Sequence, residues 1–148
     1  MSALRAGLRR RPLAVAGAVL LVAALLLVAG ACDKDNDKDD MRDSYKASLE
    51  AVNKNDGGKS YDLLSKACRD SIKKEDWEQG IKRANAALGK GKLEVGSFEV
   101  LSQRGNEASV RGSAKAKDAP PDLTIPTAPR DFRMLKEGGT WRIDDCAA

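Results

Sequence analysis

The sequence predicts an α+β domain in which helices come first and pack against an antiparallel sheet. Two observations support this fold class. Between residues 40 and 88 the larger apolar side chains recur every three or four positions, which is typical of amphipathic helices. Between residues 93 and 144 apolar and polar residues alternate, which is typical of strands with one packed face. We therefore expect a curved sheet whose apolar face covers the helices.

Three helices are predicted in the first half of the chain. The first spans residues 40–53, and the third spans residues 74–88 and ends at Gly89, because glycine tolerates the left-handed backbone of a helix end. The second begins at Ser60, and its apolar stripe continues to Ile72. These helices account for the packed layer opposite the sheet.

Four strands follow. Residues 93–102, with a bulge at Gly96, and residues 108–117 form the first hairpin around a turn at residues 103–106. A proline-rich connection leads to the last hairpin, residues 130–136 and 141–144.

The apolar face of residues 108–117 is built from small side chains, including Gly112 and Ala114. Protein interiors are close-packed, so a helix must lie close to this face or a cavity must remain beside it.

The N-terminus predicts export and membrane attachment. All four surplus positive charges of the chain precede an uncharged apolar run that ends at Cys32, and no acid occurs before Asp33. Residues 1–31 are expected to be a signal peptide, with an uncleaved single-pass membrane anchor as the alternative. Small residues directly before Cys32 resemble the lipobox of bacterial lipoproteins, although Ala29 stands where Leu, Val or Ile is usual. This resemblance implies diacylation of Cys32 and attachment to membrane lipid at the extracytoplasmic face.

Residues 32–40 alternate acids with lysines and asparagine, and they invite comparison with a calcium-binding loop. The glycine that such a loop requires is replaced by Lys38 when the loop is counted from Asp33, and the glutamate by Ser44. We therefore expect residues 32–40, the acylated cysteine included, to be a solvated spacer before a folded domain at residues 41–148.

The two cysteines that remain after Cys32 are Cys68 and Cys146. An even pair in an exported domain predicts a disulfide, worth about 4 kcal/mol in the chain-entropy estimate. The alternative is a buried helical Cys68 and a free terminal thiol.

The order of elements and the last strand, Gly-Thr-Trp-Arg-Ile-Asp at residues 139–144, resemble the nuclear transport factor two-like superfamily, and small exported actinobacterial lipoproteins in particular. This resemblance implies a conical sheet around a pocket. Some members of the superfamily use the pocket for catalysis, and others bind a ligand or a protein.

The sequence favours a non-catalytic module that binds an apolar small ligand or an envelope protein, with neither a metal nor a cofactor. Seven side chains are candidates for lining the pocket, with core packing as the alternative for each: Tyr45, Tyr61, Trp77, Phe98, Phe132, Met134 and Trp141.

Two other function classes are less supported. An isomerase or dehydratase is the enzyme alternative, but histidine is absent, and the spacing of Tyr45, Tyr61, Asp62 and Asp131 pairs no tyrosine with an acid. A partner-binding role rests only on the 20 basic and 17 acidic side chains of residues 41–148. No basic stripe with interleaved aromatics predicts nucleic-acid binding.

Overall fold

The computed structural model describes residues 33–121, 123 and 128–146. The expected signal peptide and the acylation site Cys32 lie outside these ranges. Residues 34–148 form one compact unit. No helix in the described part of the chain combines the length and the hydrophobicity needed to cross a membrane.

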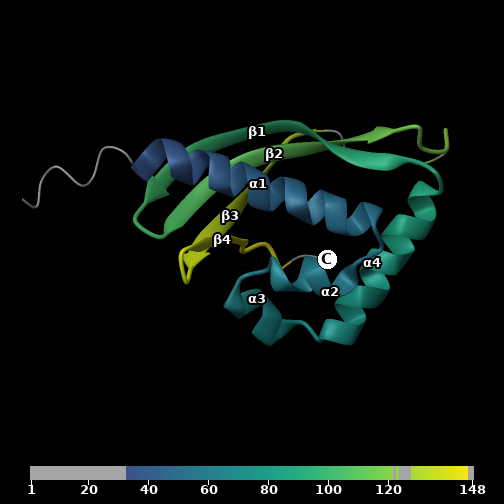
Figure 1. The fold of residues 1–148 in the computed structure, drawn as a ribbon, viewed down its shortest axis with the longest axis horizontal. Helices are drawn as coiled ribbons and strands as arrows, with labels where there is room; N and C mark the ends of the chain where they lie inside the picture. The colour runs from purple at the N-terminus through teal and green to yellow at the C-terminus, as the bar shows by residue number, and fades with distance from the viewer. Residues whose placement is uncertain (1–32, 122, 124–127, 147–148) are drawn as a thin grey trace, which may run out of the picture. The chain divides into compact units, whose positions relative to one another are not determined.

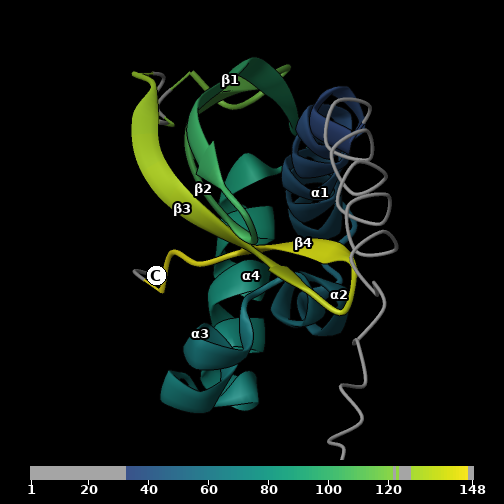
Figure 2. The same cartoon turned by 90° about the vertical axis from the view of Figure 1, so that its left-hand side faces the viewer.

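Helices precede strands, as the change of periodicity predicts, although the structure has four helices where the sequence predicted three. The helices are α1 (Asp33–Asn53), α2 (Gly57–Asp62), α3 (Lys66–Ser71) and α4 (Lys74–Leu88). The strands are β1 (Lys92–Arg104), β2 (Glu107–Lys117), β3 (Arg130–Glu137) and β4 (Thr140–Ile143). The strands pair antiparallel in the order β1-β2-β3-β4. Helix α1 runs along the sheet (Figure 1), and β3 bends around the side on which α1 lies (Figure 2).

The turn and bulge predictions are confirmed. The β1–β2 register shifts between Val95 and Ser97, so Gly96 is the bulged residue. A Cβ at Gly96 would come within 2.7 Å of the Ser113 hydroxyl oxygen, which explains why glycine is needed there. Helix α4 ends at Gly89, whose φ of 60° lies in the left-handed region.

The predicted second helix is wrong in its extent, because the structure divides it into α2 and α3. The link between them pairs with β4: Ser65 N–H donates to the Ile143 carbonyl at 2.8 Å, and Ile143 N–H donates to the Leu63 carbonyl at 2.9 Å. These backbone groups are therefore unavailable for a continuous helix. Ser65 then caps α3 by accepting from Cys68 N–H, and Asp56, instead of Ser60, caps α2.

The predicted spacer is also wrong over the described residues 33–40, because they form the first turns of α1. Asp37 is only 6% exposed. One carboxylate oxygen accepts from Lys136 Nζ at 2.6 Å and from Trp141 Nε1 at 3.0 Å, and the other accepts from Gln103 Nε2 at 2.7 Å. Asp37 precedes Met41 by four residues, so it extends the buried face of the helix by one turn.

The centre of the core lies between α1 and the inner face of the sheet. Met41, Val110, Met134 and Trp141 are fully buried there, with Tyr45 and Phe98 packed beside them. This arrangement fixes the inner surface from which the candidate site is built.

Candidate functional site

A cavity of about 590 Å³ lies between α1, α4 and the inner face of β2 and β3. Its volume falls within the range of small-molecule pockets, roughly 300–1,000 Å³. Most of its wall is apolar and is supplied by both helices, the α2–α3 link, β3 and β4: Leu49, Val52, Leu64, Ile81, Phe132 and Ile143.

The small-residue face of β2 explains why the cavity exists. Gly112 lies against α1, since a Cβ there would come within 3.2 Å of the Tyr45 ring and 3.1 Å of the Phe132 ring. Ala114, the next residue on the same face of β2, lines the cavity. The sequence predicted a close helix or a cavity, and β2 has the helix at Gly112 and the cavity at Ala114.

Three of the seven predicted pocket residues line this cavity: Tyr45, Trp77 and Phe132. The Tyr45 ring packs against Phe98 and Phe132, with centroids 5.6 and 5.4 Å away. The Trp77 indole N–H donates to the Ser60 hydroxyl at 3.1 Å, which fixes the ring at the junction of α2 and α4.

The other four predicted residues have structural roles and do not contribute to the described wall. Met134 and Trp141 are fully buried in the core, and Phe98 packs behind Tyr45. The Tyr61 hydroxyl donates to the carbonyls of Arg69 and Ile72, so it ties α2 to the end of α3. For these four residues the core alternative is the better description.

The serines that line the cavity already have hydrogen-bond partners. The Ser48 hydroxyl donates to the Tyr45 carbonyl at 2.7 Å. The Ser60 hydroxyl accepts from Trp77, and the Ser113 hydroxyl bonds the Ser97 hydroxyl at 2.8 Å. The bond of Ser48 uses its proton, whereas Ser60 is the acceptor in its bond and keeps its proton.

The Tyr45 hydroxyl differs, because it makes no hydrogen bond to another described residue. Burial raises the pKa of Tyr45, and the positive charge of Arg130 opposes that rise. The phenol is therefore neutral at physiological pH and retains its proton. The Tyr45 hydroxyl can therefore donate a hydrogen bond to a ligand.

Arg130 and Asp145 form an ion pair at the rim of the cavity. Arg130 Nη1 lies 3.0 Å from Asp145 Oδ2, and both residues line the cavity. Sequence reasoning missed this pair, since the two residues lie at opposite ends of the last hairpin region. The one signal in the sequence was that Asp145 directly precedes Cys146, whose predicted disulfide would hold this segment against the domain.

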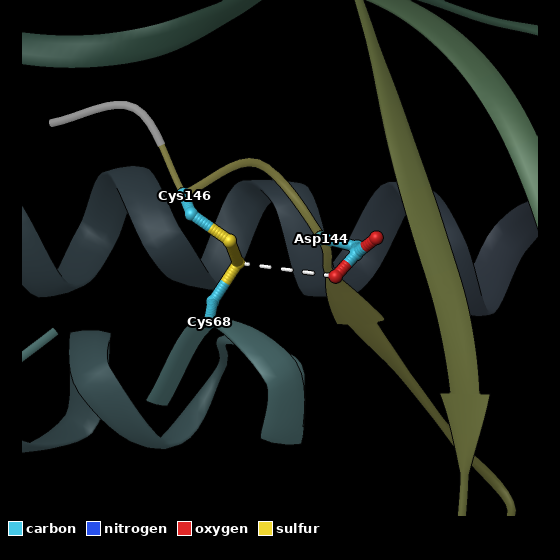
Figure 3. A group of neighbouring side chains, drawn as sticks. All are labelled: Cys68, Asp144 and Cys146. Carbon is cyan, nitrogen blue, oxygen red and sulfur yellow. Dashed lines mark hydrogen bonds between the residues drawn. A yellow bond between two sulfur atoms is a disulfide. The ribbon is translucent and has the colours of Figure 1, made fainter. Parts of the chain in front are cut away.

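The predicted disulfide between Cys68 and Cys146 is present and holds the chain end to α3 (Figure 3). The Asp144 carboxylate accepts from Ser65 Oγ at 2.6 Å and from Arg133 Nη2 at 2.5 Å, and it lies 3.8 Å from Cys68 Sγ. The two sulfurs are bonded to each other, so neither is available as a thiolate ligand for a metal ion. The bridge instead fixes the segment that carries Asp145.

A second hollow, of about 710 Å³, runs along the outer side of α1 beside the edge strand β1. Charged residues of both signs line it, among them Asp39, Arg42, Lys46 and Glu94. It has no apolar wall comparable to that of the inner cavity, which is therefore the candidate site.

No protein-family model matches the sequence, and no curated protein matches it. Several solved structures share the fold. A candidate aromatic ring hydroxylase from Novosphingobium aromaticivorans is 15% identical, with a TM-score of 0.57 over 73% of this chain and 84% of that chain. A protein of unknown function from Mycobacterium tuberculosis is 14% identical, with a TM-score of 0.52 over 78% of this chain and 73% of that chain.

A nuclear transport factor two-like protein of unknown function from Shewanella oneidensis is 19% identical, with a TM-score of 0.47 over 71% of this chain and 92% of that chain. The domain of this chain packs helices against a four-stranded antiparallel sheet. The structures with TM-scores of 0.57 and 0.52 share this α+β fold. At these identities the likeness concerns the fold alone, since one fold hosts many functions.

Proposed function

We propose that this cone is a non-catalytic binding module for a mainly apolar small molecule, held at the extracytoplasmic face of the cell membrane by an acylated Cys32. The observation that carries the proposal is the apolar cavity of about 590 Å³ whose described wall includes the Tyr45 hydroxyl, which is bonded to no other described residue. Apolar walls with few polar groups are typical of ligand pockets.

A binding role is favoured over catalysis because no described acid or base is hydrogen-bonded to the Tyr45 hydroxyl. General acid–base chemistry needs a partner within hydrogen-bond reach. Among the described residues no carboxylate bonds the Tyr45 hydroxyl, and the candidate Asp131 is bound to Arg111 on the exposed face of the sheet, at 2.6 Å from Nε. Asp62 is exposed at the end of α2. The same cone could therefore hold a ligand without converting it.

Attachment through Cys32 rests on the sequence alone. The described chain begins at Asp33 as a helix, and Asp37 joins that helix to the sheet. An acyl group on Cys32 would therefore lie within a few residues of the packed domain. Under this proposal the module operates close to the lipid surface and has ready access to apolar molecules there.

Intact and native mass spectrometry of the protein purified from its own membranes tests both parts of the proposal. We expect a chain that starts at Cys32 with acyl additions. We also expect a non-covalent adduct in the native spectrum, which denaturation releases as a chemically unchanged molecule. The Cys32→Ala variant, purified in parallel, should lose the acyl mass and membrane retention. A full-length, unacylated chain in the wild type would contradict the anchor, and a consistently empty cone would contradict the binding role.

A further inference from the structure

The rim of the cavity carries one charge of each sign. Among the described residues of its lining, Arg130 and Asp145 are the only charged ones, and they pair at 3.0 Å. The Arg130 side chain is 68% exposed and the Asp145 side chain is 19% exposed, so the acid is the more enclosed of the two. Within the described lining the two charges therefore sum to zero.

This balance disfavours charged ligands of either sign. An anionic group that approaches Arg130 would be repelled by the neighbouring Asp145 carboxylate. A cationic group that approaches Asp145 would be repelled by the neighbouring Arg130 guanidinium. Either group would also lose its hydration in an apolar cavity, which is costly unless a fixed opposite charge is available. Both fixed charges are already engaged with each other.

Inside the rim the polar contacts available to a ligand are hydroxyl groups, and the Tyr45 hydroxyl is the one bonded to no other described residue. The hydroxyls of Ser48, Ser60 and Ser113 are bonded to other groups of the protein. The Tyr45 hydroxyl has no partner among the described residues, and its ring is held by Phe98 and Phe132. A ligand oxygen that accepts from Tyr45 would satisfy this donor, whereas a pure hydrocarbon would leave it unpaired.

Building on the proposed binding role, we propose that the cone takes an uncharged molecule with a hydrocarbon body and a hydrogen-bond acceptor, such as an alcohol, ester or ketone oxygen, which Tyr45 contacts.

Three probes of equal chain length and different head group test this proposal: ω-bromoundecanol, ω-bromoundecanoic acid and ω-bromoundecylamine. Bromine quenches indole fluorescence on contact, and Trp77 lines the cavity while Trp141 is fully buried elsewhere. The full chain in lipid nanodiscs is titrated at neutral pH, where the acid and the amine are charged. The Ala114→Leu variant, which fills the cavity, supplies the background. We expect the alcohol to bind about tenfold more tightly than either charged probe.

Charge variants should then remove the selectivity against one of the two charged probes. With Asp145→Asn the rim becomes net positive, and we expect binding of the acid to tighten about tenfold while binding of the alcohol stays unchanged. With Arg130→Gln the rim becomes net negative, and we expect binding of the amine to tighten instead. Tyr45→Phe should weaken alcohol binding about fivefold, and the matched control Tyr61→Phe should not, because the Tyr61 hydroxyl bonds backbone carbonyls away from the cavity.

The outcomes separate the two proposals. If none of the probes quenches Trp77 above the Ala114→Leu background, the binding role itself fails. If the acid or the amine binds the wild type as tightly as the alcohol does, the binding role stands and the inference about an uncharged ligand is overturned. The same conclusion follows if Asp145→Asn leaves the affinity for the acid unchanged and Arg130→Gln leaves the affinity for the amine unchanged.

Discussion

Replacing Cys68 with serine is expected to lower the free energy of unfolding by about 4 kcal/mol. The bridge joins residues 78 positions apart, so its loss frees a long loop in the unfolded chain and raises the entropy of that state. It also releases the segment that carries Asp144 and Asp145 from α3. Serine at position 68 is smaller than cysteine and keeps a polar atom near Asp144, so the lost cross-link dominates the effect.

Urea unfolding of the wild type and of Cys68→Ser, without reductant, measures the difference. The matched control is the wild type with reductant, which should unfold at the same urea concentration as the variant. Cys146→Ser should lower the free energy of unfolding by the same amount as Cys68→Ser, because either substitution removes the same disulfide. A difference below about 1 kcal/mol between the oxidised wild type and both variants would contradict a stabilising role for the bridge.

Replacing Asp37 with alanine is expected to cost about 3 kcal/mol, which is a large effect for a residue so near the start of the described chain. The carboxylate is buried and accepts three hydrogen bonds, from Gln103, Lys136 and Trp141. Its removal leaves the Trp141 indole N–H in the core without that acceptor. The control Asp39→Ala changes an exposed acid on the same helix, and we expect it to be neutral within about 0.5 kcal/mol.

The contribution of Asp37 should also depend on pH. Hydrogen bonds from Lys136 and Trp141 hold the pKa of Asp37 below its ordinary value of 3.8. A lowered pKa in the folded state means that the unfolded chain takes up this proton first as the pH falls. The stabilisation is therefore complete above the ordinary value and is lost as the pH falls through the lowered one. Unfolding measured at neutral pH and below pH 4 should show the gap between wild type and Asp37→Ala narrowing in acid. A gap that stays constant or widens would contradict this assignment.

The elements that local chemistry determines could be predicted from the sequence. Helix α4 and its end at Gly89, the bulge at Gly96 and the final hairpin all follow from periodicity and glycine placement. The pairing of Cys68 with Cys146 followed from counting the cysteines of a chain that the sequence predicts to be exported. Each of these predictions uses residues that are close in sequence or alternatives that are few.

The errors come from contacts between distant segments. Asp37 looked like part of a solvated acidic run, because its partner Lys136 lies 99 positions further along the chain. The break between α2 and α3 depends on β4, whose Ile143 takes the backbone bonds of Leu63 and Ser65. A stripe of apolar residues cannot reveal such a bridge, since it describes side chains and not backbone pairing.

The candidate site was predicted in part for the same reason. Aromatic residues were assigned to a pocket by type, yet Trp141 is held in the core by Asp37 and Tyr61 by carbonyls of α3 and the residue that follows it. The face of β2 that is built from small side chains was the more informative signal. Close packing requires either a helix near such a face or a cavity beside it, whatever the rest of the fold. The Arg130–Asp145 pair could not be predicted, since it requires the closed chain end.

The most direct test of a ligand-binding cone is to fill its cavity and keep its fold. The neutral dye N-phenyl-1-naphthylamine, whose fluorescence rises in apolar surroundings, is titrated into the full chain in lipid nanodiscs. Ala114→Leu fills the cavity, and the matched control Ala116→Leu adds the same side chain at an exposed position of the same strand face. We expect saturable binding by the wild type and by Ala116→Leu, and its loss in Ala114→Leu at unchanged or higher melting temperature. Equal binding by all three proteins would contradict the account.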